Sequence, residues 1–342
     1  MKKNLKKTLS SVAGLSMLAA QALPAVAEEV TIEQNGYTVT VSEGQEAACT
    51  AVANVAGEFS FNQDVLSPSD DIFSIFGTAV TGICAKPAFA ISDAQENVEN
   101  HYINVYGNMK FNFSVSLDEL KDKEVTHTMT CSCATGAAII NASVTGVPLS
   151  AILEAAELDP GANVLKAKGS DGYGLAMPLS YAMDHRAMLV YKINGQPLPE
   201  NQNTQLWMPG TVAQYFTRDV VDLEITAEET VPEVKTAEDA YRAKISITNY
   251  FGDATVPAGH PVTFEGYADD FGTPITAIEF SMDNGATWTT CETKDATADK
   301  WVYWYFTHTP EAAGTYKLSV RAVAADGTVS PLASSLVFSV TK

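Results

Sequence analysis

The chain has 342 residues, of which 46% are hydrophobic and 18% charged, a composition typical of a globular protein and not of a disordered one. Its formal net charge of −20 repels phosphate backbones and anionic lipid, so neither nucleic acid nor a membrane surface is an expected partner. The length suffices for a targeting segment followed by two domains.

Residues 1–27 are predicted to be a secretory signal peptide. A positively charged start precedes an uncharged, apolar or small run over residues 9–23, and Ala25-Val26-Ala27 is a small-x-small cleavage site. The run is too short to span a bilayer, and no later segment is long and apolar enough to do so. We therefore expect no membrane span and an exported mature protein, located in the periplasm, on the cell surface or outside the cell.

Residues 28–100 are expected to form the irregular N-terminal part of the first domain. This stretch mixes aromatic residues with Ser, Asp, Pro and Gly, and it contains Cys49 and Cys84. Disulfides are allowed in an exported protein, so a bond between these two cysteines is the simplest prediction. The chain has five cysteines, which leaves at least one thiol unpaired.

Residues 101–228 show strands interspersed with short helices, which predicts an α+β domain. Ser116 and Glu119 have the spacing of a capping box at the start of a helix, and Pro148 suits the first turn of a helix over residues 148–158. The strand-like runs cover residues 102–108, 125–131, 163–168, 187–193 and 220–225.

Residues 229–243 are polar and acidic, as expected of a linker, and residues 244–342 are predicted to form an all-β sandwich of the immunoglobulin-like type. Turn signals such as Asp283-Asn284-Gly285 separate seven runs with alternating apolar and polar residues. These runs cover residues 244–248, 261–267, 275–281, 287–291, 301–307, 315–323 and 336–340.

Two sets of motifs resemble the sulfite oxidase family. The segments IEFSMDNGATWTTC and KWVYWYFTHTPEAAGTYKLSVRAVAADGTVSP are similar to its Ig-like dimerisation domain. The segments YINVYGNMKFNFSVSLDEL, EVTHTMTCSC, VTGVPLSAILEAAEL, GSDGYG and LWMPGTVAQYFTRDVVDLEI are similar, in the family's order, to its molybdopterin-binding domain. The resemblance implies a mixed α/β molybdopterin domain followed by the sandwich.

The same resemblance implies a molybdenum–molybdopterin cofactor with Cys131 as the catalytic residue and metal ligand. A thiolate is the soft donor that molybdenum accepts, and Cys133 is the alternative ligand because it lies on the same face of the strand two residues later. The further residues expected beside the cofactor are Asp171, Gly172, Tyr173 and Arg218.

The implied reaction is a two-electron oxygen-atom transfer or reduction on a small substrate, with an electron-transfer partner and a homodimer formed through the sandwich. Two cation-bearing motifs of the family are replaced here by residues 89–93 and 201–206, which leaves Lys166, Lys168, Arg186 and Arg218 as cations for a phosphate. The signal peptide contains lysines and no Arg-Arg pair. The alternative is therefore a cofactor-free relative that acts as an extracellular binding or structural module.

Overall fold

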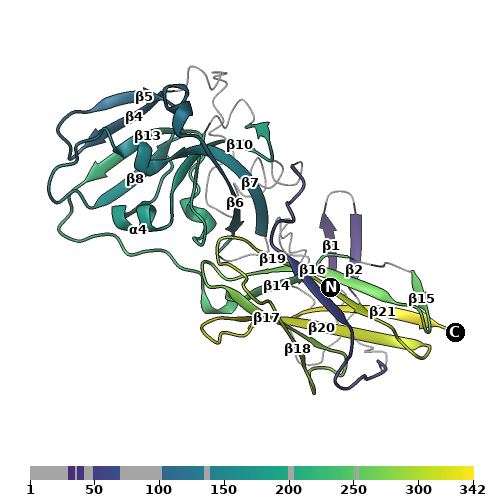
Figure 1. The fold of residues 1–342 in the computed structure, drawn as a ribbon. Helices are drawn as coiled ribbons and strands as arrows, with labels where there is room; N and C mark the ends of the chain where they lie inside the picture. The colour runs from purple at the N-terminus through teal and green to yellow at the C-terminus, as the bar shows by residue number, and fades with distance from the viewer. Residues whose placement is uncertain are drawn as a thin grey trace, which may run out of the picture.

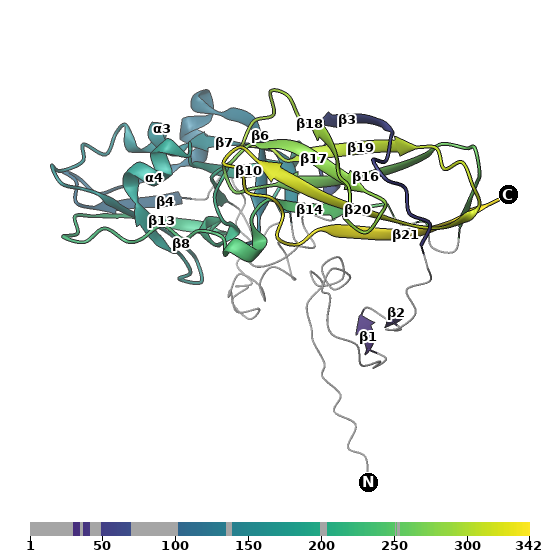
Figure 2. The ribbon, with the colours of Figure 1, turned by 90° about the horizontal axis from the view of Figure 1, so that it is seen from below.

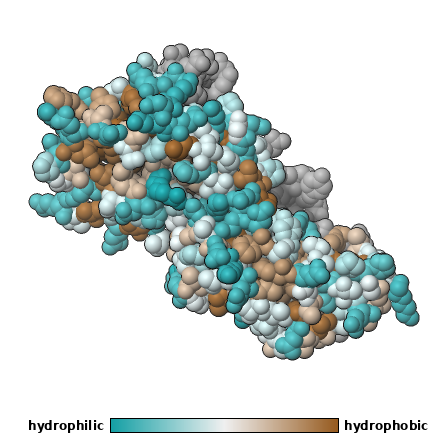
Figure 3. Space-filling model, viewed as in Figure 1, coloured by the Kyte–Doolittle hydropathy of each residue, from teal (hydrophilic) through white to brown (hydrophobic). Residues whose placement is uncertain are grey.

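A computed structural model describes residues 30–34, 37–41, 49–69, 102–134, 139–198, 204–249, 251 and 254–342. The predicted signal peptide, Cys84 and residues 89–93 and 201–203 lie outside the described residues, so the signal peptide and the Cys49–Cys84 disulfide stay predictions. Two lobes, the middle domain and the sandwich, adjoin at one end of each (Figures 1 and 3). Within the described residues, every helix is too short or too polar to traverse a bilayer.

The middle domain contains two five-stranded sheets. The first has the order β5-β4-β13-β8-β9, with β4 and β13 parallel, and the second has the order β11-β10-β7-β6, with β12 also paired to β10. The first sheet consists of β4 (Tyr102–Gly107), β5 (Phe113–Ser116), β8 (Val164–Gly169), β9 (Ala176–Pro178) and β13 (Val220–Thr226). The second consists of β6 (Val125–Ser132), β7 (Ile139–Pro148), β10 (Met188–Ile193), β11 (Gln196–Pro197) and β12 (Gln205–Trp207).

The main core of this domain lies where the two sheets meet the short helices. Alternate residues of β8, Leu165 and Ala167, are buried in it, as is Leu189 of β10. Val190, the next residue of β10, belongs to a second apolar cluster on the other side of its sheet, because successive side chains of a strand point to opposite faces. The second sheet is therefore buried on both faces.

The capping box is confirmed, since the Ser116 N–H donates to Glu119 Oε2 at 2.9 Å and the Asp118 N–H donates to Ser116 Oγ at 3.2 Å. It opens a 3₁₀ helix, η5 (Leu117–Lys123). Among the described residues, the other helical segments are α3 (Leu149–Leu153), α4 (Leu179–Asp184), η6 (Ala213–Tyr215) and η7 (Asp239–Tyr241).

Helix α3 is shorter than the predicted helix over residues 148–158. Beyond it, the Lys110 N–H donates to Glu157 O at 3.1 Å and the Asp159 N–H donates to Asn108 O at 3.0 Å. These long-range backbone hydrogen bonds, with Glu157 at a φ of 38°, replace the hydrogen bonds that would have continued the helix.

The C-terminal domain is a sandwich of a four-stranded sheet, β14-β16-β19-β3, and a five-stranded sheet, β15-β21-β20-β17-β18. All seven predicted strands are present, and β17 (Ile275–Ser281) has the predicted bounds. Between the sheets, Phe280 stacks on Phe306 with ring centroids 4.0 Å apart. The remaining strands are β14 (Lys244–Ile247), β15 (Thr255–Pro257), β16 (Val262–Asp269), β18 (Thr289–Glu292), β19 (Val302–His308), β20 (Gly314–Ala324) and β21 (Ser334–Thr341).

The ninth strand of the sandwich comes from the N-terminal part of the chain. Strand β3 (Glu58–Asn62) pairs antiparallel with β19, and its Phe59 and Phe61 pack on the sandwich core. This corrects the assignment of residues 28–100 to the first domain, because their described part at 49–62 completes a sheet of the second. Strands β1 (Val30–Gln34) and β2 (Tyr37–Val41) form a separate antiparallel pair.

Residues 63–67, which we call the strap, lead from β3 onto the middle domain. The buried Asn141 of β7 donates through Nδ2 to the Gln63 and Val65 carbonyl oxygens, both at 2.9 Å. The Asn141 N–H donates to Ser67 Oγ at 3.1 Å. At the same strap, Trp301 of the sandwich donates through Nε1 to Val65 O at 2.9 Å. The strap therefore hydrogen-bonds to both domains.

An ion pair closes the junction between the linker and the sandwich. Arg242 donates through Nε and Nη2 to the two oxygens of Asp270, at 2.7 and 2.6 Å, and the Asp270 side chain is fully buried. The Ala243 N–H also donates to this carboxylate at 2.6 Å. These hydrogen bonds offset the cost of burying the charge.

We expect Arg242→Met to lower the free energy of unfolding of the sandwich by about 3 kcal/mol, because it leaves the Asp270 carboxylate buried without its cation. Chemical denaturation of the purified protein measures the loss. Lys300→Met is the control, because Lys300 pairs with the exposed Asp64 and should contribute less than about 1 kcal/mol. Equal losses for the two variants would contradict the prediction.

Candidate active site

The candidate site lies at the end of β6, where this strand reaches the sandwich (Figures 1 and 2). Strand β6 is the edge of its sheet, so one side of its backbone lacks a partner strand. The Thr130 N–H donates to Asp299 O of the sandwich at 2.9 Å, and Ser132 forms a parallel bridge with Val212. The sandwich and residue 212 thus cover the edge, and the end of β6 becomes buried.

Cys131 points into the second apolar cluster of the middle domain and is only 3% exposed. Met129, Ile140 and Phe216 belong to the same cluster. Burial raises the pKa of the Cys131 thiol well above its usual range, Cys133 and Asp269 raise it further, and the charge of Lys244 opposes them. The thiol is therefore protonated at neutral pH until a ligand displaces the proton.

Cys133 is also buried, at 6% exposed, and its backbone lies next to a charged residue of the sandwich. Lys244 of β14 donates through Nζ to Ser132 Oγ at 3.3 Å and to the Cys133 carbonyl oxygen. Asp269 of β16 lies opposite Lys244 in the strand register. The sequence does not reveal this pair, because alternating polar residues such as Lys244 and Ser246 predict a solvent-facing side of a strand, whereas in β14 that side is buried.

The predicted loop around Asp171, Gly172 and Tyr173 connects β8 to β9 and packs on residues 212–219. The Tyr173 hydroxyl donates to Gln214 O at 2.8 Å, and the Tyr173 N–H donates to Asp171 Oδ1 at 2.9 Å. Gly172 adopts a φ of 79°, which favours glycine. Since residue 212 bridges to Ser132, one short segment joins this loop to the cysteine strand.

Arg218 lies in that segment, half-buried, with its carbonyl oxygen beside Gly169 at the start of the loop. Lys166 and Lys168 lie elsewhere, because they alternate with Leu165 and Ala167 and so face away from the core. Lys168 is paired with Glu224 at 2.7 Å. The two lysines thus lie on the outer face of the first sheet.

Arg186 bridges the two domains. It donates through Nη2 to Asp299 Oδ2 at 2.9 Å, next to the backbone contact of Thr130. Burial would raise the pKa of Asp299, but hydrogen bonds from Thr297 and Arg186 outweigh this effect and lower it. This ion pair supports the domain junction.

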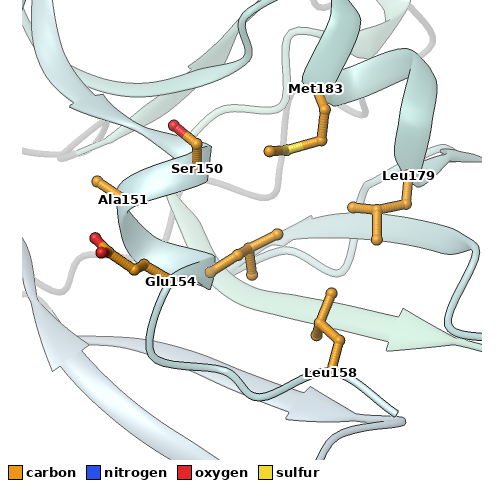
Figure 4. A pocket seen from close by; sticks show the side chains of 7 residues that line it. Ser150, Ala151, Glu154, Leu158, Leu179 and Met183 are labelled. Carbon is orange, nitrogen blue, oxygen red and sulfur yellow. The ribbon is translucent and has the colours of Figure 1, made fainter. Parts of the chain in front are cut away.

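A shallow cavity of about 530 Å³ lies between α3 and α4 (Figure 4). Leu179 and Met183 of α4 point toward α3, and Glu154 lies at the edge of the cavity. Its lining is mostly apolar and includes none of the predicted site residues.

The two domains match different families of known proteins. Residues 90–233 match the family model of the oxidoreductase molybdopterin binding domain, and residues 247–333 match that of the PKD domain. The crystal structure of the sulfane dehydrogenase SoxCD from Paracoccus pantotrophus is similar, with a TM-score of 0.58 and 23% identity over 69% of this chain and 70% of that chain. The fibronectin(III)-like modules of Clostridium thermocellum CbhA match with a TM-score of 0.23 and 16% identity, over 29% of this chain and 97% of theirs. No curated protein matches.

Residues 90–233 thus form a molybdopterin-binding oxidoreductase domain, and the class of protein is a molybdenum-cofactor oxidoreductase. The resemblance to the sulfite oxidase family that the motifs indicated is confirmed for this domain, as is its fold. The sandwich matches the PKD domain, so a dimerisation role for it stays a prediction.

The donor set at the end of β6 fits the metal of such a cofactor. Cys131 offers a soft sulfur ligand in an apolar, water-excluding setting, and Lys244 places a buried cation nearby. For the phosphate of a pterin, Arg218 is the candidate cation that lies next to the 169–174 loop.

We expect Asp299→Asn to destabilise the protein at pH 7 by less than about 1 kcal/mol, because the Arg186 side chain is 56% exposed and solvent screens the pair. The folded-state pKa of Asp299 is lowered, so its contribution is present above the unfolded pKa of about 3.9 and is lost as pH falls through the folded pKa. Urea unfolding at pH 7 and pH 3 checks this, with Glu58→Gln as the control. A difference between wild type and variant that persists unchanged at pH 3 would contradict the prediction.

Proposed function

We propose that this protein is an exported molybdenum-dependent oxidoreductase that performs a two-electron oxygen-atom transfer or reduction on a small substrate. The observation that carries the proposal is the position of Cys131, a buried thiol at the end of an edge strand within a molybdopterin-binding domain. When bound, the cofactor supplies the redox chemistry at molybdenum.

The residues of this chain would hold and shield that cofactor. Cys131 provides the protein ligand, while Met129, Ile140 and Phe216 keep water from it. Residues 169–174, with Asp171, Gly172 and Tyr173, together with Arg218, would contact the pterin. Cys133 is the alternative ligand, since it is buried two residues later.

The proposal includes two partners, an electron-transfer partner and a second copy of the chain. A two-electron reaction needs a second protein or small molecule that accepts or supplies the electrons, so we propose an electron-transfer partner. By the family resemblance we also propose that two copies of the chain associate through the sandwich.

Metal content tests the ligand assignment. Protein purified from its own host should contain close to one molybdenum per chain by mass spectrometry, and Cys131→Ser should abolish this because the hydroxyl is a poor ligand for the metal. Cys133→Ser should retain the metal, and Cys291→Ser, in the sandwich, is the matched control.

Loss of metal in Cys133→Ser with retention in Cys131→Ser would move the ligand to Cys133. Wild-type protein without molybdenum, made in a host that synthesises the cofactor, would overturn the proposal and favour the cofactor-free relative with a binding or structural role.

Export is tested separately. The mature protein recovered outside the cytoplasm should begin at Glu28, the residue after the predicted cleavage site Ala25-Val26-Ala27. Intact-mass measurement of the natural protein checks this. A full-length chain confined to the cytoplasm would contradict export and would leave the metal assignment standing.

A further inference from the structure

Lys244 is an unusually placed lysine. It is the first residue of β14 in the sandwich, yet it is only 4% exposed, and lysine is rarely buried to this degree without a specific partner. Its ammonium donates to Ser132 Oγ at 3.3 Å and to the Cys133 carbonyl oxygen, both on the cysteine-bearing segment of the other domain. It also lies 4.9 Å from the centre of the Phe271 ring.

Asp269 belongs to the same buried group. It is 5% exposed, lies opposite Lys244 in the β14–β16 register, and its carboxylate bonds to the Ser132 side chain. Burial raises the pKa of Asp269 to about 6, and the positive charge of Lys244 counteracts this rise. A cation and a carboxylate of the sandwich thus contact the one residue, Ser132, that separates the two cysteines.

A purely local role does not account for this arrangement. A lysine that served only to neutralise Asp269 would direct its hydrogen bonds within the sandwich, whereas Lys244 directs two of them to residues 132–133 of the middle domain. Burying an ammonium costs several kcal/mol, and that cost is offset only by partners with good geometry. The feature that lies next to these hydrogen bonds is the ligand position at Cys131.

We propose that Lys244 is a positioning residue for the molybdenum site, supplied by the sandwich to the cysteine of the middle domain. Its hydrogen bonds to the Ser132 side chain and to the Cys133 carbonyl oxygen fix the end of β6, and they thereby hold the neighbouring Cys131 in place for the metal. The inference rests on the proposed function. It makes the sandwich a required part of the site, since the middle domain alone lacks this cation.

The first experiment measures molybdenum per chain in four proteins: wild type, Lys244→Met, Lys244→Gln and Lys244→Arg. The neutral variants should lose metal about tenfold, as expected when an outer partner of a ligand is removed, while Lys244→Arg should retain most of it because it keeps the charge. The Gln side chain keeps a hydrogen-bond donor and lacks the positive charge. The Lys244→Gln variant therefore tests the role of the charge even if the Lys244→Met variant does not fold.

Asp269→Asn is the matched control, because it alters the same buried group and leaves the lysine in place. It should lower the melting temperature and retain the metal, so that loss of stability and loss of the cation are told apart. Equal metal content in wild type, Lys244→Gln and Lys244→Met would overturn the inference and leave the proposed function intact.

The second experiment needs no cofactor. It therefore distinguishes a failure of the positioning role from a failure of the proposed molybdenum-dependent function. In metal-free protein we expect iodoacetamide to alkylate Cys131 and Cys133 about tenfold faster in Lys244→Met than in wild type, because the strand end opens more often without its charged hydrogen bond. Peptide mass spectrometry follows each thiol, with half-buried Cys291 as the internal control. Unchanged rates at Cys131 and Cys133 would overturn the positioning role, even if wild-type protein proves to hold no molybdenum.

Discussion

The structure depends on covering the open edge of β6. An edge strand presents unpaired N–H and C=O groups. Here the Thr130 N–H is bonded across the domain boundary to Asp299 O, and Ser132 is bridged to Val212 within the middle domain. The same contact buries the two cysteines that end the strand. The domain junction and the candidate site therefore share the end of β6.

Much of the fold could be predicted from local patterns. The strands of the sandwich alternate apolar and polar residues between turn signals, and both features are set within a few residues, so β17 has the predicted bounds. The capping box at Ser116 is equally local. The helix after Pro148 is shorter than its sequence pattern predicts, because backbone hydrogen bonds with Asn108 and Lys110, distant in the chain, end it. At the site, the family motif indicated Cys131, which the structure places in a buried apolar cluster at the end of β6.

Lys244 could not be found in this way, because its partner Cys133 lies 111 positions earlier in the chain. The composition gives the number of lysines without indicating which of them face another domain, and the family motifs point to cations of the middle domain alone. The same limit applies to β3, whose alternating residues are typical of any strand and say nothing about its neighbour β19. Long-range pairing is the level at which a single sequence is least informative.

Strand β3 also constrains how the chain reaches its native state. Just before β3, the Val55 carbonyl oxygen accepts from the Thr289 hydroxyl, 234 positions later in the chain. Strand β3 itself can pair only after β19 has been made. Pairings so distant in sequence form slowly, and an unpaired strand is prone to associate with other chains while it waits. During synthesis the first strand of the sandwich is made long before the other eight, so the protein is expected to complete this domain only after the whole chain has been made.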